Sequence, residues 1–510
     1  MTEKFQDEIF AFLSNPSTHG GRKVRRIDTH AAAVFLAGDS ALKVKRAVRF
    51  PFLDYSTLAK RKAACLSELE VNKAFAAQIY RRVVPITRDA NGQLTLDGDG
   101  EPVEWAVDMF RFDENKTLDR LAETGGIDEA LAAKLAAAVV TMHAQALIAQ
   151  AEPWLAAIEN FIDQNTAAFQ STPDEFPEKL VDRLHQTSRS TLDRLRPLLL
   201  ARGRLGLVRR GHGDLHLGNI VLLSGEPVPF DAIEFDPMIA TGDILYDLAF
   251  LLMDLVERKL ARAANVVLNG YIARTRRPAD LDGLAALPLF MSLRAAIRAK
   301  VTAARIEKAD STAQVAMREI AKTYFRLALN LLSPLPPALI AVGGLSGTGK
   351  SSLARMLAPF VAPVPGALVV RSDIERKHLF CINENEHLPP EAYRPEITLK
   401  VYELLADKAA HIVAAGHSVI VDAVFAKANE RAEITKLAGN SCVAFHGLFL
   451  TADLKTRLDR VGSRGLGASD ATAAVARQQE TYALGSVEWT EINASGSLQD
   501  TLARARAVLR

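Results

Sequence analysis

The stretch Leu339-Ile-Ala-Val-Gly-Gly-Leu-Ser-Gly-Thr-Gly-Lys-Ser351 decides the fold of the C-terminal third of this 510-residue chain. Its apolar start predicts a buried strand, and the segment after Ser351 has the pattern of a helix. Glycines between the two let the backbone wrap closely around phosphates, while N–H groups and the helix N-terminus supply positive potential. A Gly-rich turn without a ligand is the alternative. The predicted phosphate-binding loop comprises Gly344, Leu345, Ser346, Gly347, Thr348, Gly349, Lys350, Ser351 and Ser352.

Two residues of this loop carry specific expectations. Lys350 is expected to reach the terminal phosphates of ATP, and Ser351 to hold Mg²⁺, which neutralises charge that develops during phosphoryl transfer. The sequence has no Asn-Lys-x-Asp guanine-recognition motif, so ATP is preferred over GTP.

Apolar runs recur downstream of the loop at 367–370, 418–421 and 443–450, and helical stretches separate them. Strands that alternate with helices are typical of a parallel sheet with crossover connections. We therefore expect a P-loop parallel α/β sheet, with ligands at the carboxyl ends of its strands.

Two acids stand at such strand ends. Asp373, in Val369-Val-Arg-Ser-Asp-Ile-Glu-Arg376, is a candidate to accept a proton from an acceptor hydroxyl, with Arg376 holding an anionic or polar group of the substrate. A helix N-cap is the alternative role of Asp373. Asp422 follows the next apolar run and is a candidate to steady the metal ion through water. A turn acid is its alternative.

Arginines recur at nearly helical spacing farther along the chain, at Arg457, Arg460 and Arg464. A mobile lid that places guanidinium groups on the transferring phosphoryl would use such a series, and Arg460 and Arg464 are its candidate catalytic members. A solvated basic face is the alternative.

These features together resemble the small P-loop kinases, a group that includes gluconate kinase, polynucleotide 5'-kinase, chloramphenicol phosphotransferase and zeta toxins. The resemblance rests on the loop, the Ser-Asp-x-x-Arg motif, Asp422 and the arginine series, and it covers about a third of the chain. It implies phosphoryl transfer to a hydroxyl group.

A second motif, His212-Gly-Asp-Leu-His-Leu-Gly-Asn219, is followed by Pro229-Phe-Asp-Ala-Ile-Glu234. Asp214 is a candidate to orient the acceptor hydroxyl, while Asn219 and Asp231 are candidate Mg²⁺ ligands. The set resembles the catalytic loop and metal-binding Asp of aminoglycoside phosphotransferases and related kinase-like enzymes. That resemblance implies a bilobal fold, and it makes Asp243 and Asp247 structural.

A kinase-like small lobe should place a Lys on its third strand, paired with a helix Glu, to hold the α- and β-phosphates. Lys43 is the first candidate, although Lys45 lies on the same face of the strand because side chains alternate with period two. Glu68 is the candidate partner. Between Lys43 and Lys45 the sequence leaves both possibilities open.

The prolines of Ser333-Pro-Leu-Pro-Pro337 mark the clearest break in the chain, because they end the preceding helix. Residues 1–332 are therefore predicted to form a kinase-like domain, with a strand-rich lobe before a helical one, and residues 338–510 the P-loop domain. The predicted fold class is α/β and α+β.

The composition of the chain limits the classes of partner and the cellular compartment that we expect. With 62 basic and 60 acidic residues, the chain has no overall field for nucleic acid or a membrane. Three scattered cysteines and an acidic N-terminus are typical of a cytoplasmic protein. No basic, aromatic-rich channel is readable, which argues against a nucleic-acid partner.

As a whole, the chain resembles bacterial two-domain proteins in which an aminoglycoside phosphotransferase-like domain is fused to a P-loop ATP-binding domain. The resemblance implies an ATP- and Mg²⁺-dependent, potentially bifunctional kinase that acts on a small-molecule hydroxyl acceptor. Two alternatives stay open: a ligand-sensing N-terminal domain that regulates the P-loop kinase, and a nucleic-acid 5'-hydroxyl kinase. The sequence identifies neither the acceptor nor the oligomeric state.

Overall fold

The computed structural model describes residues 3–50, 53–308, 310–463 and 469–509. The chain forms two compact units: the first comprises the described residues up to Ala167 together with Leu199–Asp254, and the second comprises Ala168–Leu198 with the residues from Leu255 onward. The Pro-rich stretch 333–337 lies within the second unit, between α12 (Ser311–Leu331) and β13 (Ala338–Gly344). The division into domains 1–332 and 338–510 stays a prediction.

A six-stranded antiparallel sheet forms the strand-rich part of the first unit, in the order β1-β2-β3-β8-β6-β7. Its strands are β1 (Val24–Asp28), β2 (Ala32–Ala37), β3 (Ser40–Lys45), β6 (Tyr80–Arg88), β7 (Leu94–Leu96) and β8 (Glu101–Phe110). The short apolar runs at residues 33–37 and 41–44 lie in β2 and β3.

The two faces of this sheet bury different helices. On one face Phe10 of α1 (Glu3–Ser14) packs with Leu42 and Val44. On the other face Cys65 of α2 (Leu58–Lys73) packs with Ala41. Because side chains alternate along β3, Lys43 and Lys45 project toward α2 with Ala41. This alternation brings both lysines within reach of the helix.

Helices and two short strand pairs carry the second motif in the same unit. The helices include α3 (Leu118–Glu123), α4 (Glu129–Gln145) and α8 (Ile244–Glu257). Antiparallel pairs form between β10 (Ile220–Leu223) and β11 (Glu226–Pro229), and between β9 (Val208–Arg210) and β12 (Thr241–Asp243). The loop from His212 to Asn219 therefore runs between β9 and β10.

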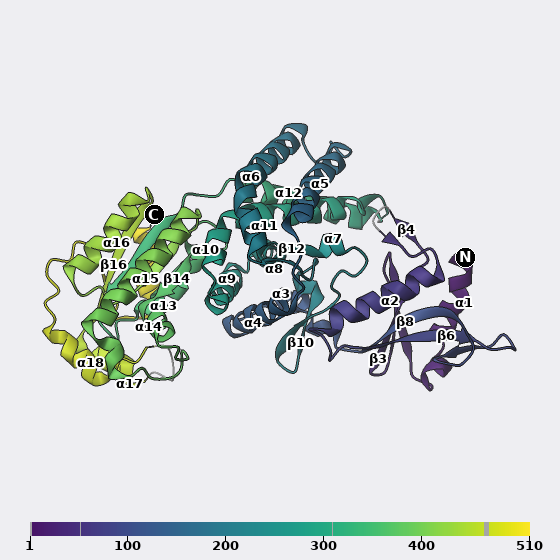
Figure 1. The fold of residues 1–510 in the computed structure, drawn as a ribbon, viewed down its shortest axis with the longest axis horizontal. Helices are drawn as coiled ribbons and strands as arrows, with labels where there is room; N and C mark the ends of the chain where they lie inside the picture. The colour runs from purple at the N-terminus through teal and green to yellow at the C-terminus, as the bar shows by residue number, and fades with distance from the viewer. Residues whose placement is uncertain (1–2, 51–52, 309, 464–468, 510) are drawn as a thin grey trace. The chain divides into compact units, whose positions relative to one another are not determined.

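The second unit contains a five-stranded parallel sheet in the order β14-β15-β13-β16-β17 (Figure 1). Its other strands are β14 (Leu368–Arg371), β15 (Val419–Asp422), β16 (Ala444–Thr451) and β17 (Thr490–Asn493). All four apolar runs that predicted parallel strands coincide with β13, β14, β15 and β16, and the predicted fold class is confirmed.

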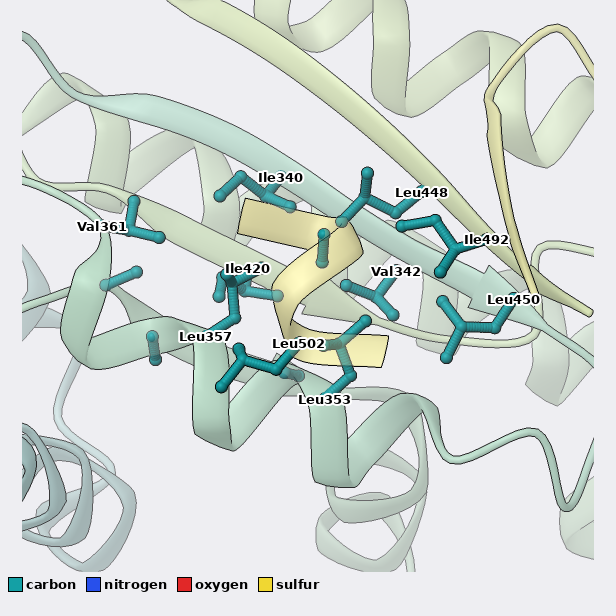
Figure 2. Packing of buried hydrophobic residues seen from close by; sticks show 14 of the residues in the cluster. Ile340, Val342, Leu353, Leu357, Val361, Ile420, Leu448, Leu450, Ile492 and Leu502 are labelled. Carbon is teal, nitrogen blue, oxygen red and sulfur yellow. The ribbon is translucent and has the colours of Figure 1, made fainter. Parts of the chain in front are cut away.

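Helices cover this sheet on both faces. Figure 2 shows Ile340, Ile420 and Leu448 of the strands packed against Leu353 and Leu502. Leu353 belongs to α13 (Lys350–Leu357) and Leu502 to α19 (Leu498–Val508). Alternate strand residues such as Ala341 and Val421 point away from this core and are also fully buried. The near-continuous apolar strands follow from this two-sided burial.

Further helices of the unit are α9 (Ala261–Thr275), α10 (Pro278–Gly283), α11 (Leu287–Ala303), α14 (Ser372–Leu379), α15 (Pro395–Ala414), α16 (Ala428–Asn440), α17 (Leu454–Gly462) and α18 (Ala473–Gln478). No helix among the described residues is both long enough and apolar enough to cross a membrane.

Candidate functional sites

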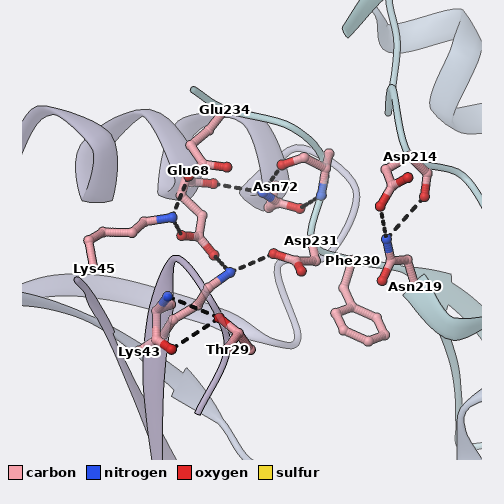
Figure 3. A network of polar contacts seen from close by, with 12 residues as sticks. Thr29, Lys43, Lys45, Glu68, Asn72, Asp214, Asn219, Phe230, Asp231 and Glu234 are labelled. Atoms are coloured by element: carbon pink, nitrogen blue, oxygen red, sulfur yellow. Dashed lines mark hydrogen bonds and ion pairs between the residues drawn. The ribbon is translucent and has the colours of Figure 1, made fainter. Parts of the chain in front are cut away.

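Lys43 joins two carboxylates in the first unit (Figure 3). Its Nζ lies 2.7 Å from Glu68 Oε1 and 2.5 Å from Asp231 Oδ1. Glu68 is fully buried, whereas the Asp231 side chain keeps 43% of its exposure. Burial acts to raise the pKa of the Asp231 carboxyl, but the charge of Lys43 holds this pKa below its usual value. The predicted Lys43–Glu68 pair is therefore formed, and Asp231 is an anion at its open end.

Lys45 makes a second, more deeply buried set of contacts. Its Nζ lies 2.5 Å from Glu68 Oε2 and also contacts Glu234, to which the Tyr55 hydroxyl donates at 2.7 Å. Burial opposes the ionised form of Glu234, but the charges of Lys45 and Lys43 lower its pKa. The structure separates the two lysines: Lys43 reaches Asp231, and Lys45 is tied to buried carboxylates.

Asp214 and Asn219 are hydrogen-bonded to each other across the loop between β9 and β10. Asn219 Nδ2 donates to a carboxylate oxygen and to the backbone carbonyl of Asp214, both at 3.0 Å. Figure 3 shows this pair near Phe230, which precedes Asp231. The structure thus brings Lys43, Glu68, Asp214, Asn219 and Asp231 together within one unit.

Buried groups hold this loop in place. Asp247 accepts hydrogen bonds from the backbone N–H groups of His212 and Gly213 at 2.9 and 3.0 Å. The His212 ring bonds to the Phe230 carbonyl at 2.9 Å, and burial lowers the pKa of His212 so that the ring stays neutral. Asp243 pairs with Arg202 at 2.6 Å. Asp243 and Asp247 are structural, as predicted.

The phosphate-binding loop of the second unit joins β13 to α13. Gly347 and Gly349 have φ values of 88° and 93°, which L side chains rarely adopt. Lys350 Nζ donates to the Leu345 carbonyl at 3.2 Å. The backbone N–H of Ser346 donates to Gln479 Oε1 at 2.6 Å. Both strand and helix predicted around this loop are present.

Asp373 and Asp422 lie at the carboxyl ends of adjacent strands. Arg371 connects them, with Nε 3.2 Å from Asp422 Oδ2 and Nη2 4.0 Å from Asp373 Oδ2. Asp373 lies in the first turn of α14, and the N-cap residue is Arg371, so the alternative role of Asp373 as a cap is wrong. Burial and then the charge of Asp422 raise the pKa of Asp373, which suits a proton acceptor.

The arginines occupy different environments. Arg457 is buried and donates to the Ser346 carbonyl at 2.9 Å, so it braces the loop. Arg460 Nη1 lies 3.4 Å from the Thr348 carbonyl, at the same loop. Arg464 lies outside the described residues. Arg376 is buried and donates to the Ala392 carbonyl at 2.6 Å, so its contact with a substrate stays a prediction.

Several residues that contact the candidate sites could not be identified from the sequence. Gln479 lies 133 residues from Ser346, and no local pattern connects them. Glu234 ends the segment Pro229–Glu234, but the sequence pattern indicates no role for it. The Lys45 and Tyr55 contacts with Glu234 arise from the sheet, α2 and the second motif coming together. A readable signal existed only for Arg371, which directly precedes the Ser-Asp-x-x-Arg motif.

A family model described as "Phosphotransferase enzyme family" matches residues 24–287, more than half of the chain. The chain belongs to the phosphotransferase enzyme family. A second model, described as "AAA domain", matches residues 339–484 of the chain. The predicted two-domain architecture, a kinase-like domain followed by a P-loop domain, is confirmed.

Curated relatives match the chain over most of their length. An uncharacterized protein of Mycobacterium tuberculosis (strain ATCC 25618 / H37Rv) is 30% identical over 461 residues, which cover 88% of each chain. An uncharacterized protein of Mycobacterium bovis has the same identity and coverage.

Solved structures resemble the two parts separately. A choline/ethanolamine kinase family protein from Mesorhizobium loti has 15% identity and a TM-score of 0.38, covering 64% of the present chain and 99% of that protein. A gluconokinase from Sinorhizobium meliloti has 20% identity and a TM-score of 0.25, covering 34% and 91%.

Proposed function

We propose that this protein is an ATP-dependent kinase that phosphorylates hydroxyl groups of small molecules, with one candidate site in each unit. The observation that carries the proposal is the contact of Lys43 with both Glu68 and Asp231, in the unit that also contains the Asp214–Asn219 pair. A cation between a buried and a partly exposed carboxylate is suited to hold nucleotide phosphates.

In the first site Asp214 is the proposed general base. The acceptor oxygen forms a bond to the γ-phosphorus, the bond between that phosphorus and the β–γ bridging oxygen breaks, and ADP leaves with the electron pair. The acceptor proton passes to the Asp214 carboxylate and then to solvent. Asn219 orients this carboxylate through its 3.0 Å hydrogen bond.

The donor set of this site suits Mg²⁺. The Asn219 amide donates its N–H group to Asp214, so its oxygen, a hard ligand, can bind a cation. Asp231 contributes a carboxylate that is partly exposed. One amide and one carboxylate, completed by phosphate oxygens, match the ligands that Mg²⁺ uses in kinases. When bound, the ion would neutralise charge on the phosphates.

In the second site the glycine-rich loop and Lys350 are the proposed phosphate-binding groups, and Asp373 is the proposed base. The raised pKa of Asp373 brings it closer to the operating pH, where a base transfers protons effectively. Ser351 and Asp422 are the proposed metal-binding residues. The same bonds form and break, and the acceptor proton passes to Asp373.

The test is ATP-dependent phosphorylation of a cell-metabolite extract, with new phosphometabolites read by mass spectrometry. Wild type is compared with Asp214→Asn and Lys350→Ala, and with the matched surface variants Asp99→Asn and Lys436→Ala, whose residues are exposed. We expect one set of products to disappear with Asp214→Asn and another with Lys350→Ala, while the surface variants behave as wild type.

The outcomes separate the alternatives. Products lost only with Lys350→Ala, together with ATP binding that Lys43→Ala leaves unchanged, would favour a sensory N-terminal domain. Phosphorylation of 5'-hydroxyl oligonucleotides alone would favour the nucleic-acid kinase. If folded Asp214→Asn and Lys350→Ala proteins both retain every product, the proposal is wrong.

A further inference from the structure

A cavity of about 250 Å³ lies inside the second unit, away from the phosphate-binding loop. One wall comes from α9 and α10, and the other from β14, α14 and α15. None of the loop residues Gly344–Ser352, nor Asp373, Arg376 or Asp422, is among the residues that line it. The cavity is therefore a separate site from the one proposed for ATP.

The walls of the cavity are joined by specific hydrogen bonds. Asn269 of α9 accepts from the Val369 N–H at 2.8 Å and donates to the Ala367 carbonyl at 3.1 Å. Asn265 donates to the same carbonyl at 3.0 Å. The two amides thus form hydrogen bonds with backbone groups at the outer side of β14, which is the edge strand of the sheet. The cavity is thus bounded by elements with a defined register.

The lining is mainly apolar, with cations at particular points. The aliphatic residues include Ile272, Leu281, Leu368, Ile374, Leu404 and Ile412. An apolar cavity of about 150 Å³ already accommodates benzene, so this one has room for an aromatic or branched aliphatic body. The size and lining fit a small organic molecule.

Cations outnumber carboxylates among the charged residues of the lining: Arg276, Arg277, Arg371 and Lys408 against Glu375 and Asp407. Three of these cations are paired, Arg277 with Asp280, Arg371 with Asp422 and Lys408 with Glu375.

Two polar groups of the lining remain available to a ligand. Among the residues that the structure describes, the Arg276 guanidinium has no hydrogen-bond or ion-pair partner. Nε2 of His378 is buried and likewise has no partner in the described part of the chain, whereas Nδ1 of the same ring lies 3.7 Å from Glu375 Oε2. An oxygen of a bound carboxylate would supply what both groups lack.

We propose that this cavity binds a small carboxylate with an apolar body, held by Arg276 and His378. The ligand would contact Ile374 of α14. Asp373 and Arg376 of the P-loop site lie on this same eight-residue helix, so the ligand and the site share one element. It would also contact Arg371, which bonds to Asp422. Occupancy therefore changes the P-loop site. This second step rests on the proposed function, but binding itself does not.

The experiment measures binding of phenylacetate to the full-length protein by saturation-transfer NMR, with neutral 2-phenylacetamide as the matched probe. Arg276→Gln removes the available cation, and Ala273→Trp fills the cavity from the exposed face of α9. Arg274→Gln is the control, because Arg274 is an exposed residue of the same helix outside the cavity.

We expect phenylacetate to bind, Arg276→Gln to weaken binding about tenfold, Ala273→Trp to abolish it, and Arg274→Gln to leave it unchanged. 2-Phenylacetamide should bind more weakly, and ATP should not displace either probe. Lys350→Ala should bind phenylacetate normally, so failure of the proposed kinase activity leaves this test intact.

Three results would overturn the proposal. Binding that persists in Ala273→Trp would place the probe elsewhere. Displacement by ATP would place it in the nucleotide site. If phenylacetate, benzoate and hexanoate all bind with a Kd above about 10 mM, which corresponds to a binding free energy weaker than about 3 kcal/mol, the cavity is not a carboxylate site. Hydrogen exchange of α14 with and without phenylacetate then tests the coupling: equal exchange contradicts it.

Discussion

At the scale of single residues, Lys45 is a buried cation between two buried carboxylates. Only 3% of its side chain is exposed, and Glu68 and Glu234 keep 0% and 5%. A buried charge is tolerated when it is paired and hydrogen-bonded, and removal of one partner leaves the other uncompensated. Lys45 therefore has a structural role, whereas Lys43 points to the open side at Asp231.

We predict that Lys45→Met lowers the free energy of unfolding by about 3–5 kcal/mol, because Glu234 stays buried without its cation. Adding Glu234→Gln should restore part of the loss. Urea unfolding of the full-length protein measures both effects, with Lys23→Met as an exposed control. A loss below about 1 kcal/mol, the usual size for surface pairs, would contradict the argument.

Asp422 places a negative charge beside Asp373, the proposed base of the P-loop site. If Asp373 is the base, it must be ionised to accept a proton, so the rate of transfer should fall as pH drops through its raised pKa. Asp422→Asn removes the repulsion that favours the protonated form. We predict that the acidic limb of the pH–rate profile then moves to lower pH, whatever happens to the maximal rate. A limb that stays in place or moves upward would contradict this.

At the scale of elements, the phosphate-binding loop depends on α17. A Cβ at Gly347 would lie 2.6 Å from the Arg457 carbonyl oxygen and 2.9 Å from its Cα. Arg457 Nε also donates a hydrogen bond to the Ser346 carbonyl at 2.9 Å. The loop and the start of α17 are therefore in direct contact, and the glycine is required for this approach as well as for its φ of 88°.

We predict that Gly347→Ala weakens ATP binding at this site by about tenfold or more, because strain of about 1–3 kcal/mol shifts the loop. Isothermal titration calorimetry of ATP on the Lys43→Ala background isolates the site. Gly439→Ala is the matched control: its Cβ would meet nothing within 4 Å in α16, so affinity should not change. Normal affinity in Gly347→Ala would show that the loop tolerates displacement.

At the scale of the whole molecule, α9 lies outside the segment matched by the AAA-domain model, yet it completes the edge of that segment's sheet. Its Asn269 replaces the hydrogen-bonding neighbour that the edge strand β14 lacks. An uncovered edge strand is open to pairing with another chain. The helices before the Pro-rich stretch and the sheet after it thus form one compact unit.

We predict that Asn269→Ala destabilises the second unit by about 1–3 kcal/mol, because the Val369 N–H and one bond to Ala367 lose their partner. Hydrogen exchange at Val369 should accelerate, as followed by mass spectrometry. Asn330→Ala, at an exposed position of α12, is the control and should exchange as wild type. Unchanged protection at Val369 would mean that α9 does not cover this edge.

Much of the architecture could be predicted from local sequence patterns. Continuous apolar runs predicted the parallel strands because both faces of that sheet are buried, and the glycines around Lys350 predicted the loop because its backbone requires them. Glu68 was the right helical partner for Lys43, since its helix position points to β3 whereas Glu70 is exposed.

The sequence by itself determined the main strands of the sheets and the two motifs, because each depends on neighbouring residues and on periodicity. Only the tertiary structure showed that Lys43 contacts Asp231 while Lys45 contacts Glu234, because these carboxylates lie 188 and 189 residues away along the chain. It also decided that Gln479 bonds to the phosphate-binding loop and that α9 encloses a cavity beside β14. Contacts between distant segments have no local pattern, since packing of the whole unit sets them.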